Sequence, residues 1–302
     1  IVIVNSASVF LQQLVNGLSL GSIYALIALG YTMVYGIVKL INFAHGDIMM
    51  MGAYAGYFVL VAMGPSPIGF CVAMFVAMLF CALLGLSIER LAYRPLRNAP
   101  RLNSLITAIA VELILQNLMR VLPFVGPNPR QFPTISVKPV NFGDVSIDGI
   151  KALVIIGSVV LMFALTFLVN YTKTGKAMRS VSYDMQASSL MGINVNKTIG
   201  ITFAIGSVLA GAGGMLYATA YPMIDPLMGY MPGLKAFVAA VLGGIGSIPG
   251  AMVGGFILGV AETLTKGYGP SNYADAISFA ILIIILLVKP SGLLGKKTVV
   301  KV

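Results

Sequence analysis

Charged side chains are scarce in this chain, and their scarcity indicates the environment in which it folds. They make up 9% of the 302 residues, whereas hydrophobic residues make up 58%. An average soluble domain has roughly 25% charged and 45–50% apolar residues. The deficit excludes an ordinary soluble protein and predicts an integral membrane protein. The net charge of +10 is not gathered into basic runs interleaved with aromatic residues, so we expect membrane lipid and no nucleic acid as a partner.

Metal ligands and catalytic groups are equally few. The one histidine, His45, has a single carboxylate beside it, which is too few ligands for a metal site. Cys71 and Cys81 fall on one expected helix, about 15 Å apart by the helical rise. That separation exceeds the roughly 7 Å limit for a disulfide, so both are predicted to be buried free thiols. No Ser/His/Asp set or nucleotide-binding loop is recognisable, and we expect neither enzymatic activity nor a cofactor in this chain.

Long hydrophobic runs are what the chain has instead. A helix needs about 20 apolar residues to span a bilayer, and the sequence predicts an all-α, polytopic membrane protein with eight or nine transmembrane helices. The segment 233–247 is short enough to be a partial crossing. The nine candidate spans are 9–37, 48–63, 68–91, 103–122, 150–170, 198–221, 233–247, 250–265 and 274–288.

The basic residues predict an orientation. Three basic segments, 90–101, 171–197 and the tail from Lys289 through Lys296, Lys297 and Lys301, are separated by even numbers of spans. The positive-inside rule then places them together in the cytoplasm, with the N-terminus outside. Segment 123–149, rich in proline, is expected to be an external loop that can hold a hairpin. No separate soluble domain is expected, so 1–302 is taken as one transmembrane domain.

Glycines mark close helix packing and two breaks. The pairs Gly17/Gly21, Gly52/Gly56 and Gly255/Gly259, and the series Gly246, Gly250, Gly254, recur at four-residue spacing, which lets helix backbones approach closely in lipid. Interrupted or re-entrant helices are expected at 39–48 and 243–250, and paired interruptions are typical of a transport pathway. The candidate pathway residues are Asn42, His45, Gly46, Asp47, Gly246, Pro249 and Gly250.

The polar cluster in "NFAHGD" has two interpretations. Asp47 can cap the helix that follows it, Gly46 can allow the chain to reverse, and Asn42 and His45 can satisfy carbonyls at the end of the preceding helix. Alternatively, these groups contact a substrate directly. Both interpretations stay open, because any polar group at membrane depth needs a partner.

Three further polar residues lie in or near expected spans. Glu112 needs a partner or a proton, because an unpaired charge at mid-span is destabilising by at least roughly 2.5 kcal/mol. Gln116, one helical turn later, is the expected partner. Glu262 is expected to be solvated or to face an external protein, and Lys235 to extend to the membrane interface.

At this point the residues resemble a known family. "INFAHGD" with "GAY", "ERLAYRPLR" and "KAFVAAVLGGIGSIPGAMVGG" together resemble the LivH-type permease of branched-chain amino acid ABC importers. The resemblance implies a bacterial-type inner-membrane permease that carries leucine, isoleucine and valine. It also implies a second, LivM-like permease subunit, two ATPase subunits that bind ATP and Mg²⁺, and an external substrate-binding protein.

The segment 171–197 is predicted to contain the ATPase contact. "QASSLMG" resembles the Glu-Ala-Ala-x-x-x-Gly pattern of a cytoplasmic coupling helix, with Gln186 in place of the acid and Gly192 as the left-handed end. Small residues permit close approach, and Leu190 and Met191 can fill a groove. An amphipathic helix resting on the membrane is the alternative. The coupling residues are Gln186, Ala187, Ser188, Leu190, Met191 and Gly192.

Two other functions remain open from the sequence. A secondary transporter of small polar solutes is possible if Glu112 and Glu262 carry protons. Relatives of this permease class also move urea, amides and other amino acids. Dependence on ATP and on partner subunits would separate the first alternative from an ABC permease, and the ligands of the binding protein would settle the second.

Overall fold

A computed structural model describes residues 6–39, 41–97, 99–142 and 145–295. Within them the chain is helical, with two small antiparallel pairs of strands, and seven helices are long and apolar enough to cross a membrane. These are α1 (Ser6–Val38), α2 (His45–Met63), α3 (Pro67–Ile88), α4 (Arg101–Val121), α5 (Gly149–Tyr171), α8 (Val195–Ala220) and α10 (Ile248–Tyr268). A π-helical turn, Glu89–Tyr93, and a 3-10 turn, Arg94–Leu96, continue α3.

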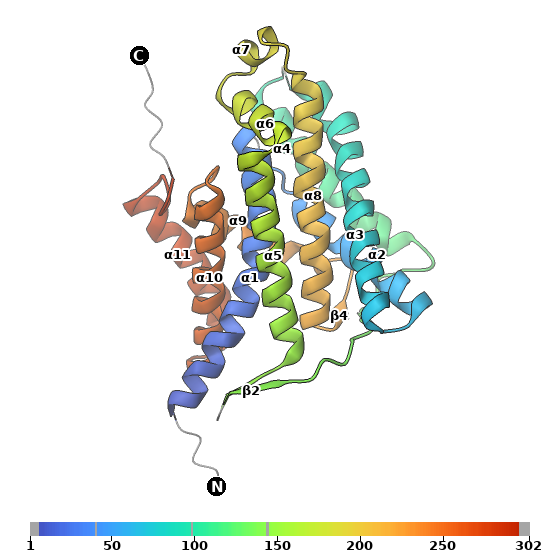
Figure 1. The fold of residues 1–302 in the computed structure, drawn as a ribbon, viewed down its shortest axis with the longest axis vertical. Coiled ribbons are helices and arrows are strands. Elements are labelled where there is room, and N and C mark those ends of the chain that lie inside the picture. Colours follow the sequence, from blue (N-terminus) through green and yellow to red (C-terminus); the bar gives the residue numbers. More distant parts are fainter. Residues whose placement is uncertain (1–5, 40, 98, 143–144, 296–302) are drawn as a thin grey trace.

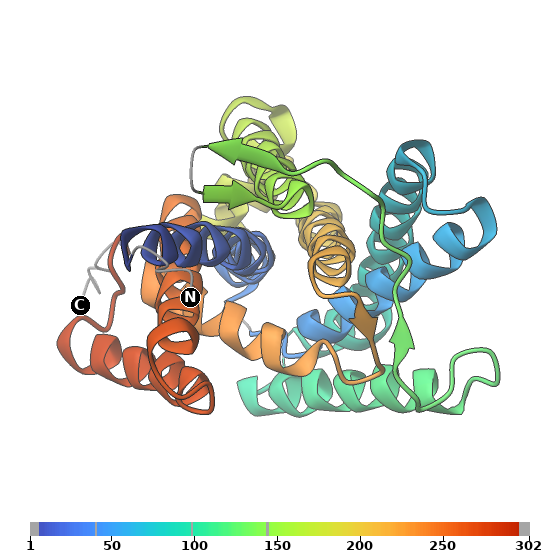
Figure 2. The same cartoon turned by 90° about the horizontal axis from the view of Figure 1, so that it is seen from below.

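Two predicted spans correspond to shorter helices. α9 (Tyr230–Gly243) has 14 residues and α11 (Tyr273–Val288) has 16. At 1.5 Å per residue α9 is about 21 Å long, less than the roughly 30 Å of a hydrocarbon core. Seen from below, α9 lies crosswise between the long helices (Figure 2).

α1 and α8 are the most buried of the long helices. α5 and α8 run along the long axis of the molecule, whereas α1 and α4 are tilted from it (Figure 1 and Figure 2). α1 packs along α10, and α8 packs against α2 and α3. Most of α4 faces outward, and its main contacts are with α2 and the π-helical turn. α4 therefore lies along one edge of the molecule, next to α9 (Figure 2).

The connections gather at the two ends of the bundle. At the lower end in Figure 1, the segment after α4 holds β1 (Arg130–Gln131) and the hairpin of β2 (Val140–Phe142) with β3 (Val145–Ile147), which confirms the predicted non-helical loop and hairpin. β1 pairs with β4 (Met223–Ile224), the strand that follows α8. At the other end lie α6 (Lys173–Tyr183) and α7 (Met185–Leu190).

Glycine contacts confirm the predicted close packing and show which helices it joins. A Cβ on Gly21 or Gly259 would meet the backbone of the partner helix, so α1 and α10 touch along these positions. A Cβ on Gly52 would likewise meet the backbone of Gly211 in α8. Gly254 faces Ala239 and holds α10 against α9. Gly246 is different, since a Cβ there meets nothing within 4 Å, and its φ of 95° serves a turn.

Both predicted helix breaks are present, but of the residues predicted to make them only Gly246 does so. α1 ends at Val38, and the next residue, Lys39, has a left-handed φ of 57°, whereas Gly46 lies inside α2 and does not make the reversal. The second break is made by Gly244 and Gly246, with φ of 105° and 95°. Pro249 does not break a helix. It occupies the first turn of α10, where a missing N–H has no consequence.

Two expectations about single residues need comment. Cys81 is buried as predicted, whereas Cys71 is exposed, so the prediction of two buried thiols was half wrong. Among the basic tail residues, Lys296, Lys297 and Lys301 lie outside the described residues, as does Leu40 in the first break.

Candidate functional site

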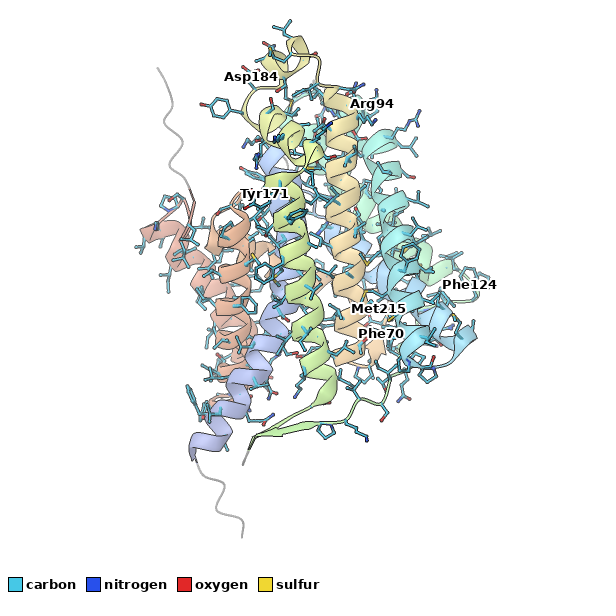
Figure 3. All side chains as sticks on the ribbon, in the orientation of Figure 1. Phe70, Arg94, Phe124, Tyr171, Asp184 and Met215 are labelled. Atoms are coloured by element: carbon cyan, nitrogen blue, oxygen red, sulfur yellow. The ribbon has the colours of Figure 1, made fainter. Side chains whose placement is uncertain are left out.

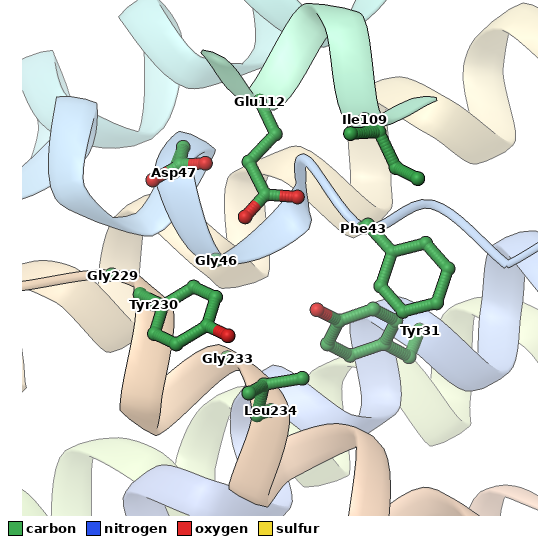
Figure 4. Close-up of a pocket in the computed structure, with 10 residues that line it drawn as sticks. All are labelled: Tyr31, Phe43, Gly46, Asp47, Ile109, Glu112, Gly229, Tyr230, Gly233 and Leu234. Carbon is green, nitrogen blue, oxygen red and sulfur yellow. The ribbon is translucent and has the colours of Figure 1, made fainter. Parts of the chain in front are cut away.

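A cavity of about 290 Å³ lies where α1, α2, α4 and α9 meet (Figure 4). Carboxylates from α2 and α4 face it, together with two tyrosines and three large apolar side chains. Its lining residues are Tyr31, Phe43, Gly46, Asp47, Ile109, Glu112, Gly229, Tyr230, Gly233 and Leu234.

The first turns of α2 and α9 form one wall of the cavity because glycines let them touch. A Cβ on Gly46 would collide with the carbonyl oxygen of Gly229, and one on Gly233 would meet the Cα of Gly46. The start of α2 also lies beside Tyr31, seven residues before the end of α1. The chain therefore folds back by about 10 Å, two helical turns, before α2 begins.

Asp47 does not cap α2 as predicted. The helix starts at His45, three residues earlier than the apolar run suggested, and no side chain caps its first turn. Asp47 is 1% exposed, and both its carboxylate oxygens lie 3.3 Å from the amide nitrogen of Gln116, which donates to them. Its position in the first turn still suits the helix dipole.

Glu112 pairs with Gln116, as the spacing predicted. The same Gln116 nitrogen lies 3.4 Å from the Oε1 of Glu112. One neutral amide therefore serves two carboxylates on neighbouring helices, at distances that are long for hydrogen bonds. No salt bridge to Asp47 or Glu112 is present among the described residues.

Asn42 and His45 flank the cavity without lining it. The side-chain oxygen of Asn42 accepts a 2.6 Å hydrogen bond from the hydroxyl of Tyr93. The ring of His45 packs edge-on against Tyr31, with 4.6 Å between centroids. Within the described part of the chain, Nε2 of His45 has no hydrogen-bond partner.

The second predicted break does not contribute to this cavity. Gly246 lies near Gly36 of α1, and Gly250 contacts Gly243 across the α9–α10 turn. Ser247 caps α10 by accepting a 3.2 Å hydrogen bond from the backbone N–H of Gly250. Gly246, Pro249 and Gly250 thus belong to the turn between α9 and α10. Of the two predicted breaks, only the one at 39–48 contributes residues to the cavity.

Glu262 is buried in a cluster of its own, so the expectation of a solvated residue was wrong. Its Oε1 lies 2.8 Å from Nζ of Lys235 and 2.6 Å from Nζ of Lys266, and its Oε2 accepts from the hydroxyl of Tyr24 at 2.9 Å. Lys235 does not extend to an interface. It is 6% exposed and also pairs with Asp275, at 2.7 Å.

The predicted coupling segment forms a short exposed helix at one end of the molecule (Figure 3). Asp184 accepts hydrogen bonds from the backbone N–H groups of Gln186 and Ala187 and so caps α7. Gly192 ends the helical turn with a φ of 82°, as predicted. Leu190 and Met191 are 89% and 83% exposed.

Ser188, which was predicted to be one of the coupling residues, is not exposed. Its side chain is buried, and its hydroxyl lies 2.8 Å from that of Ser180 in α6. The small-residue face of α7 therefore packs partly on α6, while Gln186, Ala187, Leu190 and Met191 remain exposed.

Several cavity residues were missed by the sequence analysis. Tyr31 lies in the middle of an unbroken apolar helix, where no local signal distinguishes it. The first turn of α9 carried a usable signal, because "GYMPG" (229–233) places two glycines and a proline at the start of a segment too short to span.

A chain of seven long apolar helices, with carboxylates from two helices facing a cavity between them, has the architecture of a membrane transport protein. Over residues 13–286 its sequence matches the family described as "Branched-chain amino acid transport system / permease component". The chain belongs to this family, and it is thus a permease component, separate from any ATPase.

Curated relatives agree along nearly their whole length. The chain is 46% identical to the "High-affinity branched-chain amino acid transport system permease protein LivH" of Salmonella typhimurium, over 97% of this chain and 98% of the relative. It is 45% identical to the LivH protein of Escherichia coli K12, with the same coverage. It is 43% identical to the corresponding BraD protein of Pseudomonas aeruginosa, also over 97% and 98%.

Proposed function

We propose that this chain forms one half of the membrane pathway of an ATP-driven importer for leucine, isoleucine and valine. The observation that carries the proposal is 43–46% identity, over almost the full length, to permeases named for high-affinity branched-chain amino acid transport. The acidic cavity at the start of α2 and α9 supports it, because a polar cavity among apolar helices is typical of a transport pathway.

The second half of the pathway is a different, LivM-like permease subunit. The position of α4 at the edge of the molecule supports a second subunit. α4 has a row of exposed apolar side chains on its outer face, and its Glu112 faces the cavity. A partner packed on this edge would complete the cavity wall. The exposed apolar residues of α4 are Leu102, Leu105, Ile106, Ile109, Leu113, Ile114, Leu118 and Val121.

The ATPase subunits dock on α7. An exposed Leu190–Met191 pair, held by the Asp184 cap on one side and the Gly192 turn on the other, suits a groove on a soluble partner. The α6–α7 end is then cytoplasmic, the N-terminus is outside, and the strand-bearing end receives the substrate-binding protein. α9 is too short to cross the bilayer alone, and together with the extended segment before it α9 completes one crossing that ends beside Gly36 of α1. With α1–α5, α8, α10 and α11 this makes nine crossings, which agrees with an N-terminus outside and the basic tail in the cytoplasm.

Reconstitution tests the proposal. The chain is purified with its partner permease and ATPases, placed in proteoliposomes, and supplied with the binding protein and labelled leucine. We expect uptake only with internal ATP and all partners. Uptake by this chain alone under a proton gradient would instead establish the secondary transporter. Uptake of urea or an amide in preference to leucine would contradict the proposed substrates.

A further inference from the structure

The cavity described above carries an imbalance of charge. Asp47 and Glu112 both face it, and in the described part of the chain the one hydrogen-bond donor that they share is the neutral amide of Gln116, at 3.3–3.4 Å. Among the described residues no lysine, arginine or histidine forms an ion pair with either carboxylate. Anionic groups at membrane depth require a compensating partner. The cavity therefore lacks a positive charge that a ligand can supply.

A second observation points to a ligand with a polar group. Tyr31 is 5% exposed, and its hydroxyl points into the cavity, toward Glu112 (Figure 4). This hydroxyl is within hydrogen-bonding reach of the backbone of Gly46, and within the described ranges it has no hydrogen bond to a side chain, so it can still bond to a ligand.

The wall across from Glu112 carries no charged side chain, and two of its backbone N–H groups, those of Tyr230 and Gly233, already donate to the carbonyl oxygens of Leu227 and Gly229. The wall consists of the first turn of α9, from Tyr230 to Leu234, and this turn contains no acidic residue (Figure 4). The N-terminal end of a helix carries a partial positive charge and favours a carboxylate. The two sides of one small cavity thus suit the two charged groups of an amino acid.

We propose that this cavity binds the backbone of an α-amino acid zwitterion. The ammonium group lies between Glu112 and Asp47 and donates also to the hydroxyl of Tyr31, while the carboxylate faces the first turn of α9. An aliphatic side chain then contacts the apolar lining, Phe43, Ile109 and Leu234. At about 290 Å³ the cavity is at the lower limit for ligand sites, which suits a small solute. This inference rests on the proposed function and extends it, because it gives the permease a substrate site of its own.

Ligand binding to the assembled permease–ATPase complex, in nanodiscs without the binding protein, tests the site. Three probes at millimolar concentration are compared by thermal stabilisation: leucine, 3-methylbutylamine, which lacks the carboxylate, and 4-methyl-2-oxopentanoate, which lacks the ammonium. We expect leucine to stabilise most, the amine less, and the oxo acid not at all. Equal stabilisation by the oxo acid would overturn the ammonium site.

Variants then locate the site. Glu112→Gln should weaken leucine and amine binding by about 10-fold to 100-fold, the range for losing one hydrogen bond to a charged group. Glu112→Asp, which keeps the charge, should recover part of the binding. Asp148→Asn is the matched control, because it removes a carboxylate from the exposed start of α5 and keeps the cap. It should bind leucine like the wild type.

The outcomes separate this site from the transport function. If wild-type complexes import leucine while Glu112→Gln binds leucine undiminished, the site is wrong and the proposed function stands. If Glu112→Gln binds leucine undiminished but no longer imports it, the binding site is also wrong, since Glu112 would then act in proton transfer or gating. If wild-type complexes do not import leucine under any condition, the proposed function itself fails.

Discussion

Two groups of buried carboxylates in this molecule have opposite surroundings. Glu262 and Asp47 are each 1% exposed. Glu262 lies within 2.6–2.9 Å of two lysine ammonium groups and a tyrosine hydroxyl, all from the same chain. Asp47, with Glu112 beside it, has one shared amide at 3.3 Å or more. The comparison teaches that burial alone does not identify a functional charge, and that a carboxylate beside a cavity without a counter-charge is the better candidate for one.

The cluster around Glu262 is best explained as structural. Lys235 joins α9 to Glu262 of α10 and to Asp275 of α11, and Tyr24 adds α1. These bonds fix the short helix α9, which also forms one wall of the acidic cavity. The ion-paired cluster around Glu262 therefore holds α9 in place, and α9 in turn shapes the cavity that Asp47 and Glu112 face.

Breaking the ion-paired cluster should have the largest effect on stability. Lys235→Met leaves Glu262 with only the half-exposed Lys266 as a cationic partner, and breaking a buried ion pair is destabilising by about 3–5 kcal/mol. Unfolding of the purified complex in a denaturing-detergent titration measures the loss. Lys266→Met is the matched control, and we expect a smaller effect from it.

The double variant Lys235→Met with Glu262→Leu sharpens this test. Replacing both members of a buried pair by apolar residues is often nearly neutral, so stability should recover relative to Lys235→Met. An additive loss in the double variant would show that Lys235 and Glu262 do not act as a pair.

Gly46→Leu should have the next largest effect. Its side chain would collide with the carbonyl of Gly229 and separate α2 from α9, and overpacking of this kind is destabilising by typically about 1–3 kcal/mol. Leucine uptake should be lost with it. At Gly36 an added Cβ would meet its nearest neighbour at 3.8 Å, so Gly36→Ala is the control and should be close to wild type.

Asp47→Asn should affect the fold less than transport. The amide oxygen can still accept from Gln116, so unfolding should change by less than about 1 kcal/mol. Uptake should fall about 10-fold, the size of one lost hydrogen bond to a charge. Unchanged uptake together with a large loss of stability would instead place Asp47 in the structural class with Glu262.

Variants of the coupling helix should have the smallest effect on the stability of the chain. Ala187 and Gly192 are exposed, so Ala187→Arg and Gly192→Asp leave both carboxylate clusters untouched, apart from some strain at the left-handed Gly192. We expect the permease pair to stay assembled and the ATPase subunits to be lost on purification. Full retention of the ATPases with normal substrate-stimulated hydrolysis would contradict the docking role of α7.

The sequence predicted features that depend on neighbouring residues. Runs of apolar residues indicated the long helices, glycine spacing indicated close helix packing, and the four-residue spacing of Glu112 and Gln116 indicated their bond. It could not predict contacts between residues far apart in the chain. Lys235 meets Glu262, and Gln116 meets Asp47, only because helices that are distant in sequence pack side by side.

Small errors in helix ends also changed the interpretation of residues. Starting α2 at 48 made Asp47 a cap, whereas the start at His45 places Asp47 inside the first turn, facing α4. Glycine and proline in 243–250 correctly indicated a break, but the sequence could not tell which of them adopts the turn and which begins the next helix.

The glycine seam between α1 and α10 has a consequence for biogenesis. α1 is made first, yet the helix whose backbone fits it begins only at Ile248. At about 5–20 residues per second, α1 waits on the order of 10–40 s for that partner. During this interval its seam is covered by lipid or by other helices, so the slow step in maturation should be the arrival of α10. Truncation before Ile248 should therefore give chains that insert into the membrane but are degraded quickly.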